Sequence, residues 1–152
     1  MNASDRLAHI EQTAHYKLQG STRMLVSREL RRLARVLTPD ERLLSLAQCR
    51  MDQATGLIGL TDQRLLFIGR QLAAEERVLH AARSDYTFAE LEAVQGEQRV
   101  LSGSLILHLS GGRTQITDVN PPERAIEIAA LARARIEAER KGRQSDMPSQ
   151  AA

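Results

Sequence analysis

The spacing of hydrophobic and polar residues divides the chain into three zones. Residues 1–38 have apolar side chains at the three- and four-residue spacing of amphipathic helices, and residues 43–119 have the spacing of strands. Residues 120–140 return to the helical spacing, whereas residues 141–152 carry few apolar side chains. The pattern predicts a helical N-terminal extension over 1–37, a β-rich domain over 38–140 and a disordered tail over 141–152.

Two helices are expected in the first zone. Ser4 is the expected cap of a first helix, which ends at Gly20-Ser21. The second runs from Ser21 or Thr22 to Leu37, because a residue before proline, here Thr38, is disfavoured in the α conformation. Residues 38–41 also match a capping box, so the sequence allows a further helical turn there. Residues 43–50 fit either a strand or a helix.

The middle zone contains two predicted hairpins. In the first, apolar runs at 55–61 and 64–70 are joined by Asp62-Gln63, and Gly59 and Gly69 indicate bends or a close approach of backbones. In the second, residues 104–110 alternate and return as 113–119 after Gly111-Gly112, which supply the positive φ angles of a tight turn.

Between the hairpins, strands are expected at 84–88 and 92–98. Residues 72–83 stay open, because 73–77 have a composition that favours a helical turn as well.

A single amphipathic helix is predicted after the strands. Asn120 is its expected cap, with proline in the first turn and Glu123 three residues later. Several strands followed by one such helix predict a small β-barrel or sandwich that the helix closes.

Two segments resemble a known family. The segments LTPDERLL (37–44) and TGLIGLTDQRLLFIG (55–69) are similar to the opening of bacterial PH-like (pleckstrin-homology-like) domains. Those domains have a Pro-x-Glu turn before the first strand and Leu-Thr-Asp-x-Arg before an apolar third strand. The resemblance covers about residues 28–138.

The resemblance implies a mainly β fold with flanking helices, of the α+β kind. The implied fold is a PH-like barrel of about seven antiparallel strands in two roughly orthogonal sheets. The C-terminal helix caps the barrel, and the N-terminal helices precede it. It also implies a non-enzymatic binding module. Inositol-phosphate recognition is not expected, because the loop at 50–54 carries one cation and one anion and the chain has no Trp.

The composition of the chain excludes several kinds of site and several classes of function. A single cysteine, Cys49, excludes a disulfide framework and fits a reducing cytoplasm, and the polar segment 1–6 lacks the apolar region of a secretory signal. Aromatic residues make up 3% of the chain, which argues against surfaces that stack nucleic-acid bases. The four histidines show no metal-ligand spacing, and no catalytic motif is present, so neither a cofactor nor a reaction is expected. A cytoplasmic protein is predicted.

The second predicted helix has a basic face. Helical spacing gathers Arg28, Arg31, Arg32 and Arg35 on one side and leucines on the other. Such a face suits an acidic protein partner, anionic lipid at the periphery of a membrane or, more weakly, nucleic-acid phosphates. The simpler interpretation is a helix that buries its leucines and leaves its arginines in solvent.

Residues 65–68 are apolar on both faces of their strand, so something must cover the second face. The N-terminal helices or a second subunit could provide this cover. The candidate interface residues are Leu30, Leu33, Leu66 and Ile68. We therefore expect protein–protein association or self-assembly, with peripheral binding to anionic membrane and weak nucleic-acid binding as alternatives.

Overall fold

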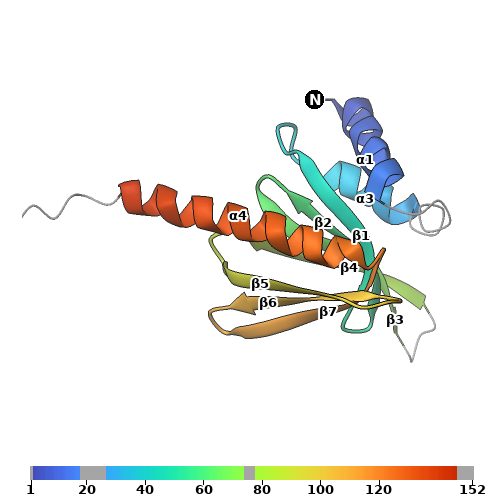
Figure 1. The fold of residues 1–152 in the computed structure, drawn as a ribbon. Coiled ribbons are helices and arrows are strands. Elements are labelled where there is room, and N and C mark those ends of the chain that lie inside the picture. The colour runs from blue at the N-terminus through green and yellow to red at the C-terminus, as the bar shows by residue number, and fades with distance from the viewer. Residues whose placement is uncertain (1, 18–26, 74–77, 147–152) are drawn as a thin grey trace, which may run out of the picture.

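The computed structural model describes residues 2–17, 27–73 and 78–146. In this part of the chain, one antiparallel sheet carries helices on both faces (Figure 1). The helices are α1 (Ala3–Lys17), α3 (Ser27–Val36) and α4 (Glu123–Asp146). The strands are β1 (Leu43–Met51), β2 (Ala54–Thr61), β3 (Arg64–Ala73), β4 (Val78–Thr87), β5 (Leu91–Gln98), β6 (Gly103–Leu109) and β7 (Gly112–Asn120).

The sheet has seven strands in the order β4-β3-β2-β1-β7-β6-β5. This confirms the expected strand number and the C-terminal helix. β1 pairs with both β2 and β7, so the two expected sheets are continuous with one another. The sheet is not closed, because β4 and β5 do not pair. Instead α4 packs along β5, where Arg140 donates a hydrogen bond of 2.7 Å to the carbonyl oxygen of Glu92.

The inner face of the sheet packs against α4. Strands β1, β5, β6 and β7 lie next to the helix, and their buried side chains share one core with a stripe of small and aliphatic residues on it: Ala125, Ile128, Ala129, Ala132 and Ile136. The helix comes close to the sheet at Gly96, where an added Cβ would lie 2.4 Å from the carbonyl oxygen of Ala125. Only glycine permits this approach of helix to strand.

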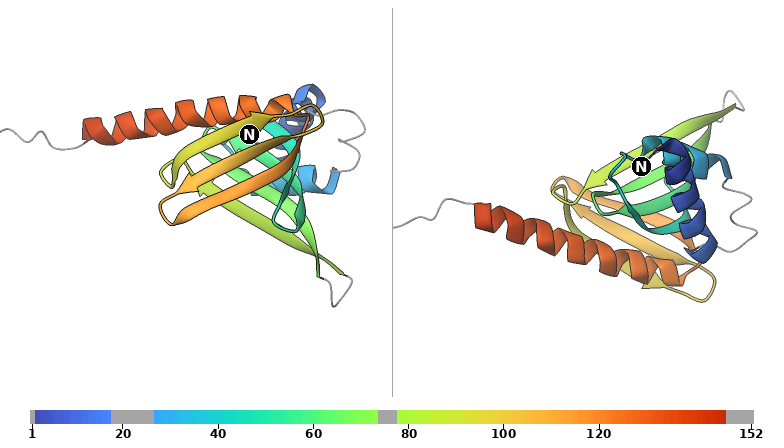
Figure 2. Two further views of the ribbon diagram at one scale, coloured as in Figure 1. Left: turned by 60° about the horizontal axis from the view of Figure 1, so that its bottom comes forward. Right: turned by 90° about the horizontal axis from the view of Figure 1, so that it is seen from above.

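The outer face of the sheet packs against α1 and α3, which form a second core (Figure 2). Strand β3 contributes to both cores, with Leu65 and Phe67 on the inner side and Leu66 and Ile68 on the outer side. The side-chain alternation of a strand thus explains why the sequence is apolar at every position here.

The four candidate interface residues lie in this outer core. Leu30, Leu33, Leu66 and Ile68 are 7%, 2%, 0% and 1% exposed, because α1 and α3 cover β2 and β3 within the same chain. Of the two covers that the sequence allowed, the structure has the N-terminal helices. These four side chains are therefore not accessible to a partner.

Several helix boundaries differ from the prediction. The side chain of Asn2, rather than Ser4, caps α1 by accepting a hydrogen bond from the amide of Asp5 (2.8 Å). The structure shows the second helix from Ser27, and its expected start at Ser21 or Thr22 lies outside the described residues. The sequence predicted a disordered tail over 141–152, but α4 continues to Asp146, so the prediction is wrong for 141–146. Residues 147–152 are outside the described residues.

The loops and strands also differ in detail. Residues 43–50 are a strand, and 38–41 form a turn without a helix. The second hairpin turns at Ser110-Gly111, one residue earlier than expected, and Gly112 has the positive φ of 147°. β3 continues to Ala73, and β4 begins at Val78. The helical turn that the sequence allowed at 73–77 falls largely on residues 74–77, which are outside the described residues.

At the helix start, Asn120 ends β7 and α4 begins only at Glu123, so Asn120 is not the cap.

Two glycines of β2 offer a test of backbone packing. An added Cβ at Gly56 would lie 2.1 Å from the carbonyl oxygen of Ile68, whereas at Gly59 the nearest atom is Cδ1 of Leu43 at 3.4 Å. Gly59 therefore does not mark the expected close approach, but Gly69 does, since its Cβ would lie 2.6 Å from the carbonyl oxygen of Thr55.

We expect Gly56→Ala to destabilise the protein by about 1–3 kcal/mol or more, because the backbone of β3 must move. Gly59→Ala should change the free energy of unfolding by less than about 1 kcal/mol, and is the matched control. Urea unfolding of both variants measures the difference, and equal stabilities would contradict this packing.

Candidate functional site

The arginines of α3 do not all share one exposed face. Arg28, Arg31 and Arg35 are exposed, as the sequence predicts. Arg32 instead turns toward the sheet and donates hydrogen bonds to the carbonyl oxygens of Gly69 (2.7 Å) and Ala82 (3.4 Å). Arg32 therefore anchors α3 on β3 and β4, and the exposed basic face consists of the other three.

A small groove between α1 and α3 adds a fourth arginine to this face. We call it the α1/α3 groove; its volume is about 220 Å³ and it is lined by Arg6, Leu7, Arg31, Ala34 and Arg35. Nε of Arg6 donates a hydrogen bond to the carbonyl oxygen of Ala34 at 3.2 Å, which ties the two helices together. Sequence reasoning missed Arg6, because no spacing rule relates residues on two different helices.

The groove combines positive charge with apolar surface. The side chains of Leu7 and Ala34 are apolar, and three guanidinium groups surround them. Among the described residues, no carboxylate pairs with Arg31 or Arg35. Glu29, which the sequence places beside the cluster, is buried and accepts a hydrogen bond of 2.6 Å from Nε of Arg70. Glu29 therefore does not neutralise Arg31, the groove arginine nearest to it in the sequence.

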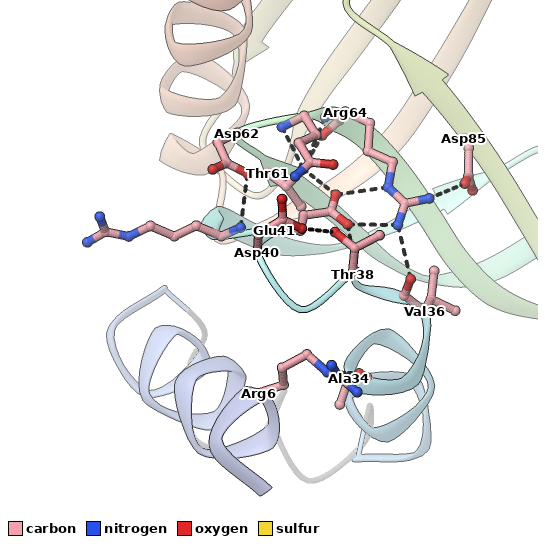
Figure 3. Close-up of polar contacts among 12 residues, drawn as sticks. Arg6, Ala34, Val36, Thr38, Asp40, Glu41, Thr61, Asp62, Arg64 and Asp85 are labelled. Carbon is pink, nitrogen blue, oxygen red and sulfur yellow. Dashed lines mark hydrogen bonds and ion pairs between the residues drawn. The ribbon is translucent and has the colours of Figure 1, made fainter. Parts of the chain in front are cut away.

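A second polar cluster holds the residues that carry the family resemblance (Figure 3). Glu41 is buried and accepts hydrogen bonds from Nε (2.9 Å) and Nη2 (2.8 Å) of Arg64, from the Thr61 hydroxyl (2.6 Å) and from the amide of Thr38 (3.1 Å). Nη2 of Arg64 also donates to the carbonyl oxygen of Val36 (3.1 Å) at the end of α3. We call Glu41, Arg64 and Asp85 the clasp.

Asp85 completes the clasp on β4. It accepts hydrogen bonds from Nη1 of Arg64 (2.6 Å) and from Nε of Arg83 (2.9 Å). The clasp therefore joins the end of α3, the turn before β1, the β2–β3 hairpin and β4. The sequence indicated only a hairpin role for Arg64, because Glu41 and Asp85 are too distant along the chain for any local pattern to reveal the pairing.

The clasp shifts the pKa values of both carboxyl groups. Burial by itself would raise the pKa of Glu41, but hydrogen bonds from Arg64, Thr61 and Thr38 outweigh it and lower the pKa below its ordinary value. The hydrogen bond from Arg83 lowers the pKa of Asp85, against partial desolvation, and the charges of Arg83 and Arg64 lower it further. Both groups are held as carboxylates, with their oxygens occupied by structural partners.

Other reactive side chains also have structural roles. Cys49 is buried and its burial raises the pKa of the thiol, so the sulfur is a poor nucleophile. Nε2 of His9 accepts a hydrogen bond from the amide of Leu43 at 3.2 Å. Within the described residues, no group of three or more His, Cys, Asp or Glu side chains is placed to hold a metal ion. None of the described helices has the length and apolar character needed to cross a membrane.

The ion pair between Glu41 and Arg64 provides a stability test. Removing one partner leaves a buried charge, so Glu41→Met or Arg64→Met should each destabilise the protein by about 3–5 kcal/mol. The double variant should recover much of this loss, because an apolar pair of similar volume replaces the ion pair. Urea unfolding of the four proteins gives the coupling energy, and additive losses would show that the two residues do not interact.

Acid should weaken the clasp. Glu41 and Asp85 have folded-state pKa values below their unfolded values of about 4, so their contribution is complete above about pH 5 and is lost as the pH falls through the folded values. The melting temperature should therefore fall on acidification, and less steeply for Glu41→Gln, which has no carboxylate to protonate. Glu137→Gln on the exposed side of α4 is the control and should keep the wild-type slope. An unchanged slope in Glu41→Gln would contradict the shifted pKa.

Comparison with known proteins places these features in a family. The chain is similar in structure to a DUF1696-family protein with a pleckstrin-homology domain from Shewanella loihica PV-4, with 14% sequence identity and a TM-score of 0.40 over 62% of this chain and 77% of that one. A comparison with curated proteins found no match. The bacterial PH domain family matches residues 37–134, which include the turn before β1, all seven strands and the buried part of α4 up to Ala132. The chain therefore belongs to the bacterial PH domain family.

Proposed function

We propose that this protein is a non-catalytic module that associates with another protein through the α1/α3 groove. The observation that carries the proposal is the arrangement of Arg6, Arg31 and Arg35 around the apolar side chains of Leu7 and Ala34. Arginine forms bidentate hydrogen bonds with carboxylates, and an apolar floor accepts an aliphatic side chain. The partner that fits is a segment in which acidic residues flank a leucine or a similar residue.

The proposed partner is a protein rather than a membrane because of how α3 is buried. A basic amphipathic helix binds a bilayer by inserting its apolar face below the lipid headgroups. In this chain Leu30, Leu33 and Leu37 of that face are 7% exposed or less, because they pack on the sheet. Anionic lipid would meet the arginines alone, and three exposed arginines give a weak attraction that salt screens.

Nucleic acid is the weaker alternative for the same face. Such binding relies on many phosphate contacts, and its affinity falls steeply with salt. The groove instead offers an apolar floor, which phosphates do not use. The non-catalytic part of the proposal is supported by the family, which is typically non-catalytic, and by the clasp, whose charged groups are engaged in the fold.

Binding of a labelled synthetic peptide with the repeat Glu-Leu-Glu-Asp tests the proposal. We expect a complex whose affinity falls by about tenfold or more in the Arg31→Glu/Arg35→Glu variant, since carboxylates then face carboxylates. Arg135 is exposed on α4, outside the groove. The Arg135→Glu variant reverses one positive charge there and should bind the peptide as the wild type does. Fluorescence anisotropy at two salt concentrations measures both effects.

Anionic vesicles and short DNA serve as competing ligands in the same titrations. Phosphatidylglycerol vesicles that bind more tightly than the peptide, with the same loss in the double variant, would replace the protein partner by a membrane. Absence of peptide binding, or equal binding by all three proteins, would remove the groove as the site.

A further inference from the structure

Strand β4 is an open edge of the sheet. Among the described elements, β3 is the neighbour that pairs with β4, and no described element lies along its other edge (Figures 1 and 2). The opposite edge differs, because α4 packs along β5 and Arg140 occupies the Glu92 carbonyl oxygen there. An uncovered edge presents unpaired backbone amides and carbonyls, which can pair with another strand.

The side chains on the inner side of β4 do not cover this edge either. The side chains of Ser84 and Tyr86, on the inner side of β4, line a polar cleft of about 380 Å³ together with residues of β7. Ala81 and Arg83 on the outer side are exposed. From the described helices, Arg32 reaches the Ala82 carbonyl oxygen at 3.4 Å. The rest of the edge around Ser84 thus remains accessible to an extended chain.

The charges on β4 decide which extended chain fits. Arg83 and Asp85 lie two residues apart on the same face, and their side chains are 45% and 31% exposed. An edge that carries charges of one sign repels a second copy of itself, and proteins use such charges to prevent edge pairing. This edge carries one charge of each sign, so it does not repel its own copy.

We infer that β4 pairs antiparallel with β4 of a second copy, about a two-fold axis at Ser84. A two-fold axis perpendicular to the sheet keeps equivalent faces together, so only residues an even number apart can oppose one another. With the axis at Ser84, Arg83 of each copy lies opposite Asp85 of the other, and Ala82 lies opposite Tyr86. An axis at Arg83 or at Asp85 would place like charges opposite each other.

The dimer joins two seven-stranded sheets edge to edge. Arg83 and Asp85 pair within each chain, and this register sets the pair of one copy beside the pair of the other with unlike charges opposed, on both sides of the axis. This inference does not rest on the proposed function, because the α1/α3 groove uses other residues on other elements. The Arg31→Glu/Arg35→Glu variant should therefore form the same dimer as the wild type.

Sedimentation velocity over a concentration series tests the dimer. The wild type should pass from monomer to dimer, and Arg83→Glu should raise the dissociation constant by about tenfold or more, because a second carboxylate then faces Asp85 of the other copy. Arg135→Glu, on α4, is the control and should dimerise as the wild type does. A strictly monomeric wild type, or an Arg83→Glu variant that dimerises equally well, would overturn the inference.

Disulfide trapping tests the register independently of the charges. Ser84→Cys places two thiols opposite each other at the axis, with Cα atoms about 4.5–5.5 Å apart, within the range that disulfides span. Ala81→Cys is the control, because its two copies lie about 20 Å apart along the strands in this register. The native Cys49 is buried and does not compete. Under mild oxidation the Ser84→Cys variant should cross-link rapidly and Ala81→Cys slowly, and equal rates would exclude the axis at Ser84.

Discussion

The apolar character of β3 on both faces is the constraint on which the rest of the molecule depends. Leu65 and Phe67 need cover on one side of the sheet, and Leu66 and Ile68 need it on the other. α4 provides the first cover and the N-terminal helices provide the second. Because burial of aliphatic side chains is the main driving force of folding, α1 and α3 are part of the folded unit rather than an appendage to it.

The residues by which the family is recognised serve this arrangement. Glu41 and Arg64 come from the segments that resemble other bacterial PH-like domains. Together they connect the end of α3 to the β2–β3 hairpin through hydrogen bonds (Figure 3). A buried ion pair adds little net stability compared with an apolar pair, but an unpaired member is costly. The segments that carry the family resemblance therefore join distant parts of the chain, and the α1/α3 groove lies outside them.

The sequence predicted what local periodicity and turn chemistry determine. The two predicted hairpins and the last helix follow from alternation, from Asp62-Gln63 and from the apolar stripe of α4, whereas the number of strands was implied by the family resemblance. Contacts between distant segments escaped prediction, because one sequence contains no signal for them. Arg32 lies on the arginine face by helical spacing, yet the crossing of α3 over β3 turns it toward Gly69. Arg6 enters the groove for the same reason.

The seam between β1 and β7 has a further consequence for how the chain folds. Strands β1 to β4 form one meander and β5 to β7 form another, so most pairings join neighbours in the sequence. Among the described strands, only the seam joins the two meanders, through a few pairs whose register shifts between Gln48 and Arg50. Each meander can form through short loops, whereas the seam closes a loop that includes β2 to β6. That closure has the largest entropic cost, so the joining of two preformed halves is expected to limit the folding rate.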